Sequence, residues 1–313
     1  MTVPRLPSPL EPGVMTDAGH RLVGQVVAWY HEHARDLPWR APDRTAWGVL
    51  VSEVMLQQTP VVRVEPAWRA WMTRWPTPAD LAAAPTADVL RAWDRLGYPR
   101  RALRLQQCAQ AVVERHDGRV PDDEDALLAL PGIGAYTAAA VLAFAYGWRA
   151  VVLDTNVRRV LARAVDGHAL PAPSQTRAEV ARAAALVPRD DAGAARWAQA
   201  SMELGALVCT ARSPRCDRCP VAASCAWVAA GRPADQHAHR RRAQAWAGTD
   251  RQVRGRIMAL LRESPVPVPE PVLDEAWPPT PQRARAVAGL LADGLVVQEQ
   301  PSADEPTRYA LPA

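Results

Sequence analysis

The pattern of apolar and polar residues predicts a chain built mainly from short helices. Apolar residues recur at helical spacing in segments that proline and glycine interrupt, and the clearest are 20–34, 63–75, 78–96, 100–116 and 137–148. Strand-like alternation is nearly absent before residue 295. We therefore expect a mostly α fold from about Asp17 to Pro279.

The C-terminal part of the chain has a different pattern. Residues 230–250 have linker composition and include a run of arginines, so a domain boundary is expected there. Three helical segments follow at 250–264, 269–277 and 281–294, and then two alternating strands at 295–300 and 307–312. This order predicts a small α+β module of winged-helix type over residues 251–313.

One predicted helix contains a carboxylate in apolar surroundings. In "AWGVLVSEVMLQQTP", the helical neighbours of Glu53 are Val49, Leu50, Leu56 and Gln57. A carboxylate among aliphatic side chains either has a buried partner or is held near-neutral for proton transfer. Glu53 is therefore a candidate acid.

Composition narrows the possible chemistry. All 37 basic residues are arginine, so the chain has no lysine amine that could form a Schiff base. No run of 18 or more apolar residues occurs, so no membrane span is expected. The proline-rich segment 1–16 is expected to be a flexible tail, and it lacks the apolar core of a signal peptide. We expect a cytoplasmic protein, in which cysteines stay reduced.

Four of the five cysteines form a motif of spacing C-x6-C-x2-C-x5-C. Four thiolates within 17 residues can surround one metal centre, and the spacing alone suits either a structural zinc ion or a [4Fe–4S] cluster. The isolated Cys108 is expected to be a small buried apolar side chain. The candidate ligands are Cys209, Cys216, Cys219 and Cys225.

Two further motifs precede the cysteines. In "LPGIGAYTAAAVLAF", Gly132 and Gly134 predict a tight hairpin that opens into a helix. This segment resembles a helix-hairpin-helix, whose glycines let backbone N–H groups approach a DNA phosphate. In "AVVLDTNVRRVLARAV", an apolar run ends at Asp154 and a helix begins at once. Asp154 is therefore placed as a helix N-cap, whose hydrogen bonds favour its ionised form.

Taken in this order, the motifs resemble the helix-hairpin-helix DNA glycosylase superfamily, and the cysteine motif narrows this to the endonuclease III-like branch with an iron–sulfur cluster. "LPWR" (37–40), "SEVMLQQT" (52–59) and "LDTNV" (153–157) resemble the MutY-type adenine DNA glycosylases, over residues 20–229. The resemblance implies a two-lobed catalytic region, 17–229. Its six-helix barrel spans about 46–153, and 17–45 with 154–229 forms the lobe that holds a [4Fe–4S] cluster on the four cysteines.

The same resemblance implies a hydrolase of base excision repair that flips adenine out of double-stranded DNA and releases it. Glu53 would protonate the departing adenine, helped by an apolar setting that raises its pKa, and ionised Asp154 would stabilise the oxocarbenium-like sugar. Asn156 lies beside Asp154, and Tyr136 stands where bifunctional relatives carry a lysine. We expect a monofunctional, monomeric, nucleoid-associated enzyme acting on adenine opposite 8-oxoguanine or guanine.

The resemblance also assigns DNA contacts. Gln58 and Tyr98 match residues at the gap and the opposite strand, although Pro99 stands where the family usually has a second tyrosine. Arg35, Trp39 and Gln199 match the adenine pocket. The full set of expected substrate and DNA contacts is Arg35, Leu37, Trp39, Arg40, Gln57, Gln58, Thr59, Tyr98, Gly132, Gly134 and Gln199.

The C-terminal module departs from the family, which usually carries a β-rich nudix-like domain there. It is expected either to grip DNA phosphates through Arg283 and Arg285 or to pack as a cap on the catalytic region. Two other functions stay open on the sequence. One is a thymine or uracil mismatch glycosylase of the same superfamily, and the other is a non-catalytic iron–sulfur regulator that binds DNA.

Overall fold

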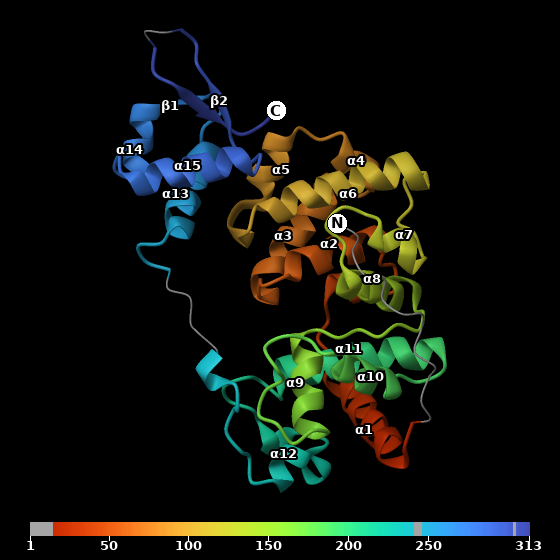
Figure 1. The fold of residues 1–313 in the computed structure, drawn as a ribbon. Coiled ribbons are helices and arrows are strands. Elements are labelled where there is room, and N and C mark those ends of the chain that lie inside the picture. Colours follow the sequence, from red (N-terminus) through yellow and green to blue (C-terminus); the bar gives the residue numbers. More distant parts are fainter. Residues whose placement is uncertain (1–14, 241–245, 303–304) are drawn as a thin grey trace. The chain divides into compact units, whose positions relative to one another are not determined.

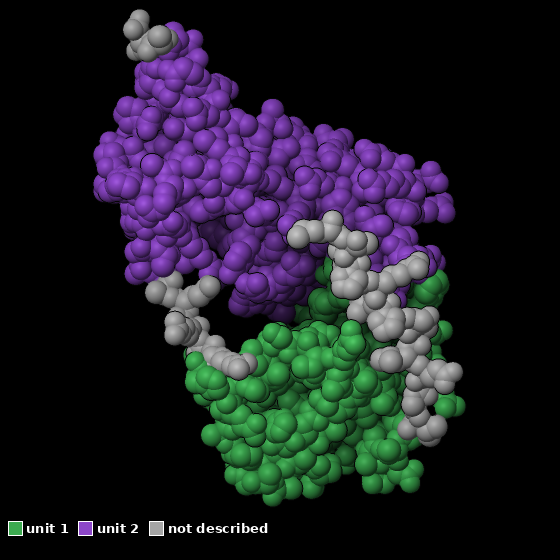
Figure 2. All heavy atoms as spheres, viewed as in Figure 1, with its two compact units in different colours: residues 1–43, 134–242 green, residues 44–133, 243–313 purple. Residues whose placement is uncertain are grey.

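The computed structural model describes residues 15–240, 246–302 and 305–313. Contacts divide the chain into unit 1, residues 1–43 and 134–242, and unit 2, residues 44–133 and 243–313 (Figures 1 and 2). Most of the expected tail, 1–16, and part of the expected linker, 230–250, lie outside the described residues. The fold is mostly helical, as predicted. No described helix is long and apolar enough to cross a membrane.

Unit 1 is built on three helices from distant parts of the sequence. Helix α1 begins where Thr16 caps it and contacts α11, which also contacts α9. Its helices are α1 (Asp17–His33), α8 (Ala135–Val141) with a π-helical turn (Leu142–Tyr146), α9 (Thr155–Ala164), α10 (Arg177–Ala185), α11 (Asp191–Leu207) and α12 (Ala226–Ala229), with 3-10 turns at Pro38–Arg40, Cys216–Arg218, Ala222–Ser224 and Ala238–Arg240.

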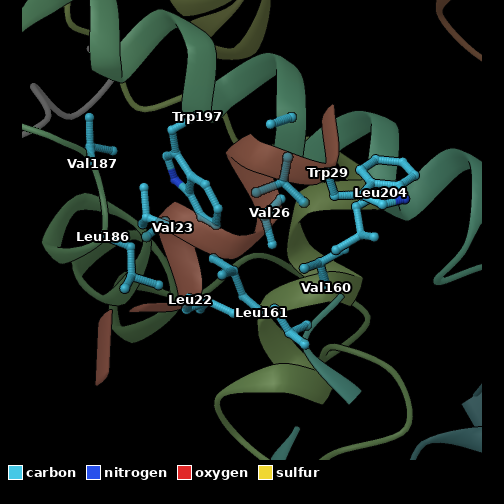
Figure 3. Close-up of a cluster of buried hydrophobic side chains, with 14 of the residues drawn as sticks. Leu22, Val23, Val26, Trp29, Val160, Leu161, Leu186, Val187, Trp197 and Leu204 are labelled. Atoms are coloured by element: carbon cyan, nitrogen blue, oxygen red, sulfur yellow. The ribbon is translucent and has the colours of Figure 1, made fainter. Parts of the chain in front are cut away.

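The core of unit 1 is aliphatic with two tryptophans (Figure 3). Val26 of α1, Val160 of α9 and Leu204 of α11 are almost fully buried in it. Trp29 of α1 and Trp197 of α11 are also buried in it. This core fixes the start of α9, and with it Asp154, against α11.

The first part of unit 2 consists of the helices between residues 44 and 133. They are α2 (Ala46–Leu56), α3 (Val61–Arg74), α4 (Pro78–Ala82), α5 (Thr86–Trp93), α6 (Arg100–His116) and α7 (Glu124–Leu128), with a 3-10 turn at Asp94–Leu96. Helix α6 contacts α2, α4 and α5. Trp71, Trp75 and Trp93 form an edge-to-face cluster, with ring centroids 4.6 and 5.6 Å from Trp71. The expected segment 78–96 is broken at Pro85, which cannot continue α4.

The C-terminal module also belongs to unit 2. It consists of α13 (Asp250–Glu263), β1 (Val268–Pro269), a 3-10 turn (Glu270–Val272), α14 (Leu273–Ala276), α15 (Pro281–Ala292), β2 (Val297–Glu299) and β3 (Arg308–Ala310). The sheet is antiparallel in the order β1-β3-β2, with Val297 opposite Ala310. The two predicted strands are confirmed, and the order of elements is that of a winged helix. Strand β1 was not predicted because its two residues lie in a proline-rich stretch.

The module packs on the helices before residue 133 through α13. Helix α13 contacts α5, and the guanidinium of Arg91 donates a hydrogen bond to the carbonyl of Ser264, at 3.2 Å. The predicted phosphate contact by Arg283 is wrong. Its side chain is buried inside the module, where it donates to the Asp274 carboxylate and, at 3.2 Å, to the carbonyl of Trp277.

Candidate functional site

Helix α2 carries Glu53 in a wholly buried setting. Thr45 caps its N-terminus by accepting a hydrogen bond from the Gly48 N–H, at 3.0 Å. Every residue from Trp47 to Met55 is buried, so the helix has no solvent-facing side, and Glu53 is 4% exposed. The sequence predicted an apolar stripe along one side of this helix, whereas in the structure residues on every side of the helix are buried. Burial by itself disfavours the charged form of a carboxyl group.

A single guanidinium organises the end of α2. Arg101 donates to the carbonyl oxygens of Val54, Met55, Gln57, Leu96 and Gly97, at 2.6 to 3.1 Å, and also to the hydroxyl of Thr59. It thereby ties the C-terminus of α2 to the loop before α6. Burial lowers the pKa of this arginine to about 10.

Gln58 and Tyr98, the residues expected at the gap and the opposite strand of the DNA, lie directly beside residues whose carbonyl groups Arg101 holds. Gln58 has φ +58° and Tyr98 has φ +47°, both in the left-handed region that non-glycine residues seldom adopt. Both side chains are exposed, Tyr98 by 40%. Thr59, in contrast, is buried, and its hydroxyl donates to the Leu96 carbonyl at 2.9 Å. Thr59 therefore supports the loops rather than presenting a group to a ligand.

The glycine hairpin has the geometry that its sequence predicts. Gly132 has φ +79°, and a Cβ atom there would lie 2.9 Å from the Cβ of Arg104, so glycine is required. Gly134 occupies the N-cap position of α8. Tyr136, in the first turn of that helix, is half-buried.

Asp154 caps α9 and is held by two hydrogen bonds. One carboxylate oxygen accepts from the Val157 N–H at 2.6 Å, and the other accepts from the Asn156 side chain at 2.7 Å. Burial raises the pKa of Asp154, and these hydrogen bonds together with the charge of Arg159 offset only part of that rise. The sequence predicted the cap but not the burial.

Arg35 and Arg40 share one buried carboxylate. Arg35 forms a two-pronged ion pair with Glu203, at 2.7 and 2.8 Å, and Arg40 adds a contact at 3.0 Å. Burial alone would raise the pKa of Glu203, but these guanidinium groups hold it down to about 2. The Tyr30 hydroxyl donates to the Gln199 amide oxygen, at 3.2 Å.

The expected pocket residues that precede α2 are close together in sequence. Leu37 and Trp39 are buried, at 4% and 5% exposure, and they flank the start of the 3-10 turn that carries Arg40. The predicted set Arg35, Leu37, Trp39, Arg40 and Gln199 lies in unit 1, as do Asp154 and Asn156, whereas Glu53, Gln57, Gln58, Thr59, Tyr98 and Gly132 lie in unit 2.

The four motif cysteines lie on one loop of unit 1 after α11. The thiol of Cys219 has its pKa raised to about 11, first by burial and then by the charges of Cys209, Cys225 and Cys216, so the four side chains share one electrostatic environment. Four such thiolates need a cationic centre to be stable together. The donor set therefore fits an iron–sulfur cluster.

Two buried arginines connect this loop to α9. Arg159 donates to the carbonyl of Cys209 at 2.6 Å and to the side-chain oxygen of Asn156 at 2.8 Å. Arg163 donates to the Cys209 sulfur at 3.4 Å and lies over the ring of Trp227, 4.7 Å from its centroid. Through Asn156, the cysteine loop is thus joined to Asp154.

Sequence reasoning missed four of these residues. Arg101, Arg159 and Arg163 lie on helices with ordinary amphipathic patterns, and nothing in the sequence marks their buried acceptors. Glu203 could have been found, because it stands among apolar residues in "SMELGALV", just as Glu53 does in α2.

No group of three or more His, Cys, Asp or Glu side chains close enough to hold a metal ion is found in the described part of the chain. The assignment of a cluster rather than a zinc ion therefore rests on the loop's sequence and on comparison. Residues 209–225 match the iron–sulfur binding domain of endonuclease III, which establishes the [4Fe–4S] cofactor on the loop predicted to hold it.

Residues 51–185 match the family described as HhH-GPD superfamily base excision DNA repair protein. An adenine DNA glycosylase of Mycolicibacterium smegmatis is 56% identical over 88% of this chain and 92% of its own. One from Mycobacterium tuberculosis is 51% identical over 96% of this chain and 97% of its own. A solved thermostable thymine-DNA glycosylase covers 68% of this chain and 97% of its own, at 27% identity and a TM-score of 0.62. The chain therefore belongs to the adenine DNA glycosylases of the HhH-GPD superfamily.

Proposed function

We propose that the protein is a monofunctional glycosylase that flips adenine out of double-stranded DNA and releases it by hydrolysis, when the adenine is paired with 8-oxoguanine or guanine. The observation that carries this proposal is the burial of Glu53 in α2, within the motif that resembles adenine glycosylases. Because its substrate is genomic DNA, we place the enzyme on the nucleoid, acting as a monomer.

In this reaction the Glu53 carboxyl group donates its proton to a ring nitrogen of the flipped adenine. The bond between the sugar C1′ and adenine breaks, and its electron pair leaves with the base. The sugar becomes oxocarbenium-like, and the Asp154 carboxylate stabilises its positive charge. Water then adds to C1′ and loses a proton, leaving an abasic site.

The other expected residues position the DNA. Gln58 and Tyr98 contact the gap left by the flipped base and the opposite strand, and the exposure of both residues and their left-handed backbone conformation support this role. Trp39, Arg35 and Gln199 line the adenine pocket. The iron–sulfur cluster fixes the cysteine loop, and Arg159 and Arg163 hold α9 against that loop.

The chain's composition supports the proposed absence of lyase activity. A strand-cleaving glycosylase needs an amine that attacks C1′, and the chain has no lysine. Tyr136 occupies the place of the lysine in bifunctional relatives, and its phenol cannot form a Schiff base. Borohydride should therefore trap no covalent DNA adduct on any side chain, and a trapped side-chain adduct would contradict this part of the proposal.

The second candidate is a thymine or uracil mismatch glycosylase, which the likeness to the solved thymine-DNA glycosylase favours. The two are separated by measuring base release from duplexes that contain A:8-oxoguanine, A:G or T:G, with cluster-loaded protein. We expect release from the two adenine duplexes only. Faster release of thymine from T:G than of adenine would favour the second candidate.

A further inference from the structure

A groove in unit 2 lies between the C-terminal module and the loops that carry Gln58 and Tyr98. Its volume is about 1050 Å³, and its walls are the segment Asp94–Arg104 on one side and α13 on the other. Figure 2 shows the surface of unit 2 hollowed at this place, beside the start of α6. Eight arginines line the groove, against the three acids Asp94, Glu263 and Asp293, so it is strongly positive.

Several of these arginines lack a carboxylate partner in the described part of the chain, and one of them, Arg256, lies over the ring of Trp277, 5.3 Å from its centroid. The side chains of Arg95, Arg104, Arg251 and Arg256 are exposed, and none forms an ion pair with a carboxylate of the described residues. One of the three acids is already paired within the groove. Asp293 pairs with both Arg100 and Arg254. The uncompensated charge is therefore concentrated on the two facing walls.

The surface of α13 between its arginines includes two small residues. Gly255 and Ala259 are exposed one turn apart and line the groove together with Arg251 and Arg262. The ring of Trp246 lies against Gly255, whereas the side chain of Ala259 is a single methyl group, so a phosphate backbone can approach α13 closely at Ala259.

One contact links this helix to the Tyr98 loop. The guanidinium of Arg251 lies over the ring of Tyr98, 4.5 Å from its centroid, and 5.3 Å from the ring centroid of Trp246. A cation stacked on a tyrosine ring restrains that ring. The module thus contacts the residue that we assign to the gap in the DNA.

We propose that this groove binds the phosphate backbone of duplex DNA, and that α13 rather than α15 is the DNA-contacting helix of the module. The inference rests on the proposed function for the identity of its ligand. It extends the DNA interface from the catalytic helices onto the C-terminal module and replaces the contact expected from Arg283, which is buried.

The test adds a negative charge to the groove and measures binding to an undamaged duplex by fluorescence anisotropy. Ala259→Glu places a carboxylate on the groove wall, and Ala288→Glu places the same group at an exposed position of α15 that does not line the groove. We expect the first variant to bind about tenfold more weakly and the second to bind as the unchanged protein does. Thermal unfolding verifies that both variants are folded.

A second pair of substitutions measures the number of phosphate contacts directly. In Arg251→Gln/Arg256→Gln, the slope of log Kd against log salt concentration should fall by about 0.9 for each arginine removed. The control is Arg285→Gln. The side chain of Arg285 is 63% exposed and does not line the groove, so this variant should keep the original slope.

The proposal is overturned if Ala259→Glu and the double variant keep the affinity and slope of the unchanged protein. Failure of the proposed function gives a different result. In that case the unchanged protein releases no adenine, and this holds whether or not the groove variants bind DNA more weakly. Normal adenine release with unaltered binding by the groove variants would remove the groove proposal alone.

Discussion

At the scale of single residues, Asp154 illustrates how a group proposed to act in catalysis can oppose stability. Burial raises its pKa, so its surroundings disfavour the ionised carboxylate. In the proposed reaction the ionised form is nevertheless the one that stabilises the sugar cation. The stability contributed by protonated Asp154 is present below its ordinary pKa and is lost as pH rises through the raised value.

Asp154→Asn should therefore abolish adenine release without destabilising the protein. Asparagine keeps the N-cap of α9 and removes the buried charge, so the melting temperature at pH 7.5 should be unchanged or higher. Single-turnover release should fall at least about a hundredfold. Asp190→Asn, at the exposed N-cap of α11, is the matched control and should change neither quantity appreciably. Near-normal release by Asp154→Asn would remove Asp154 from the mechanism.

Arg101 is a second residue whose removal has a defined effect. In Arg101→Met, five carbonyl oxygens and the Thr59 hydroxyl lose their donor, so we expect a loss of about 2–4 kcal/mol in the free energy of unfolding. Urea unfolding measures it. Arg69→Met, which removes only an exposed pair with Glu65, should cost less than about 0.5 kcal/mol. Equal effects of the two substitutions would contradict the role assigned to Arg101.

At the scale of elements, Glu203 fastens the segment before α2 to α11. Its pKa of about 2 lies below its ordinary value, so its contribution to stability is present above about pH 4.5 and is lost as pH falls toward 2. Glu203→Gln should lower the free energy of unfolding at pH 6 by about 3 kcal/mol.

The difference between this variant and the unchanged protein should shrink as pH falls from about 4.5 toward 2, which urea unfolding at several pH values measures. Glu32→Gln, at an exposed position of α1, provides the control and should show no such trend. A difference that is independent of pH would mean that the Arg35–Glu203 pair does not contribute through its charge.

The elements themselves were largely predictable from the sequence. The expected helix at 100–116 is the observed α6, and the N-cap at Asp154 is confirmed, because spacing of apolar residues and capping residues act locally. Strand β1 and the burial of Arg283 were not predictable. Strand β1 depends on Tyr309, a partner far along the chain, and the burial of Arg283 depends on an ion pair with Asp274 of the preceding helix α14, which no local apolar pattern indicates.

At the scale of the whole molecule, motifs pointed to candidate site residues but not to what supports them. The four cysteines, Glu53 and Asp154 became candidates because the expected chemistry requires those residue types at those spacings. Their supports, such as Arg159 and Arg163, were not found, since any arginine on a helix has the same sequence signature whether it is buried or solvated. Packing between segments that are distant in the sequence decides whether such an arginine is buried or exposed to solvent.

The central claim is that Glu53 supplies the proton for adenine release, and one measurement tests it most directly. Single-turnover release of adenine from an A:8-oxoguanine duplex is compared for the unchanged protein, Glu53→Gln and the exposed control Glu114→Gln, all loaded with the cluster and saturating the duplex. Glutamine keeps the size of the side chain but has no acidic proton. The account predicts a rate about 10²- to 10⁴-fold lower for Glu53→Gln and an unchanged rate for the control. A Glu53→Gln rate within about threefold of the unchanged protein, a barrier change below 1 kcal/mol, would contradict it.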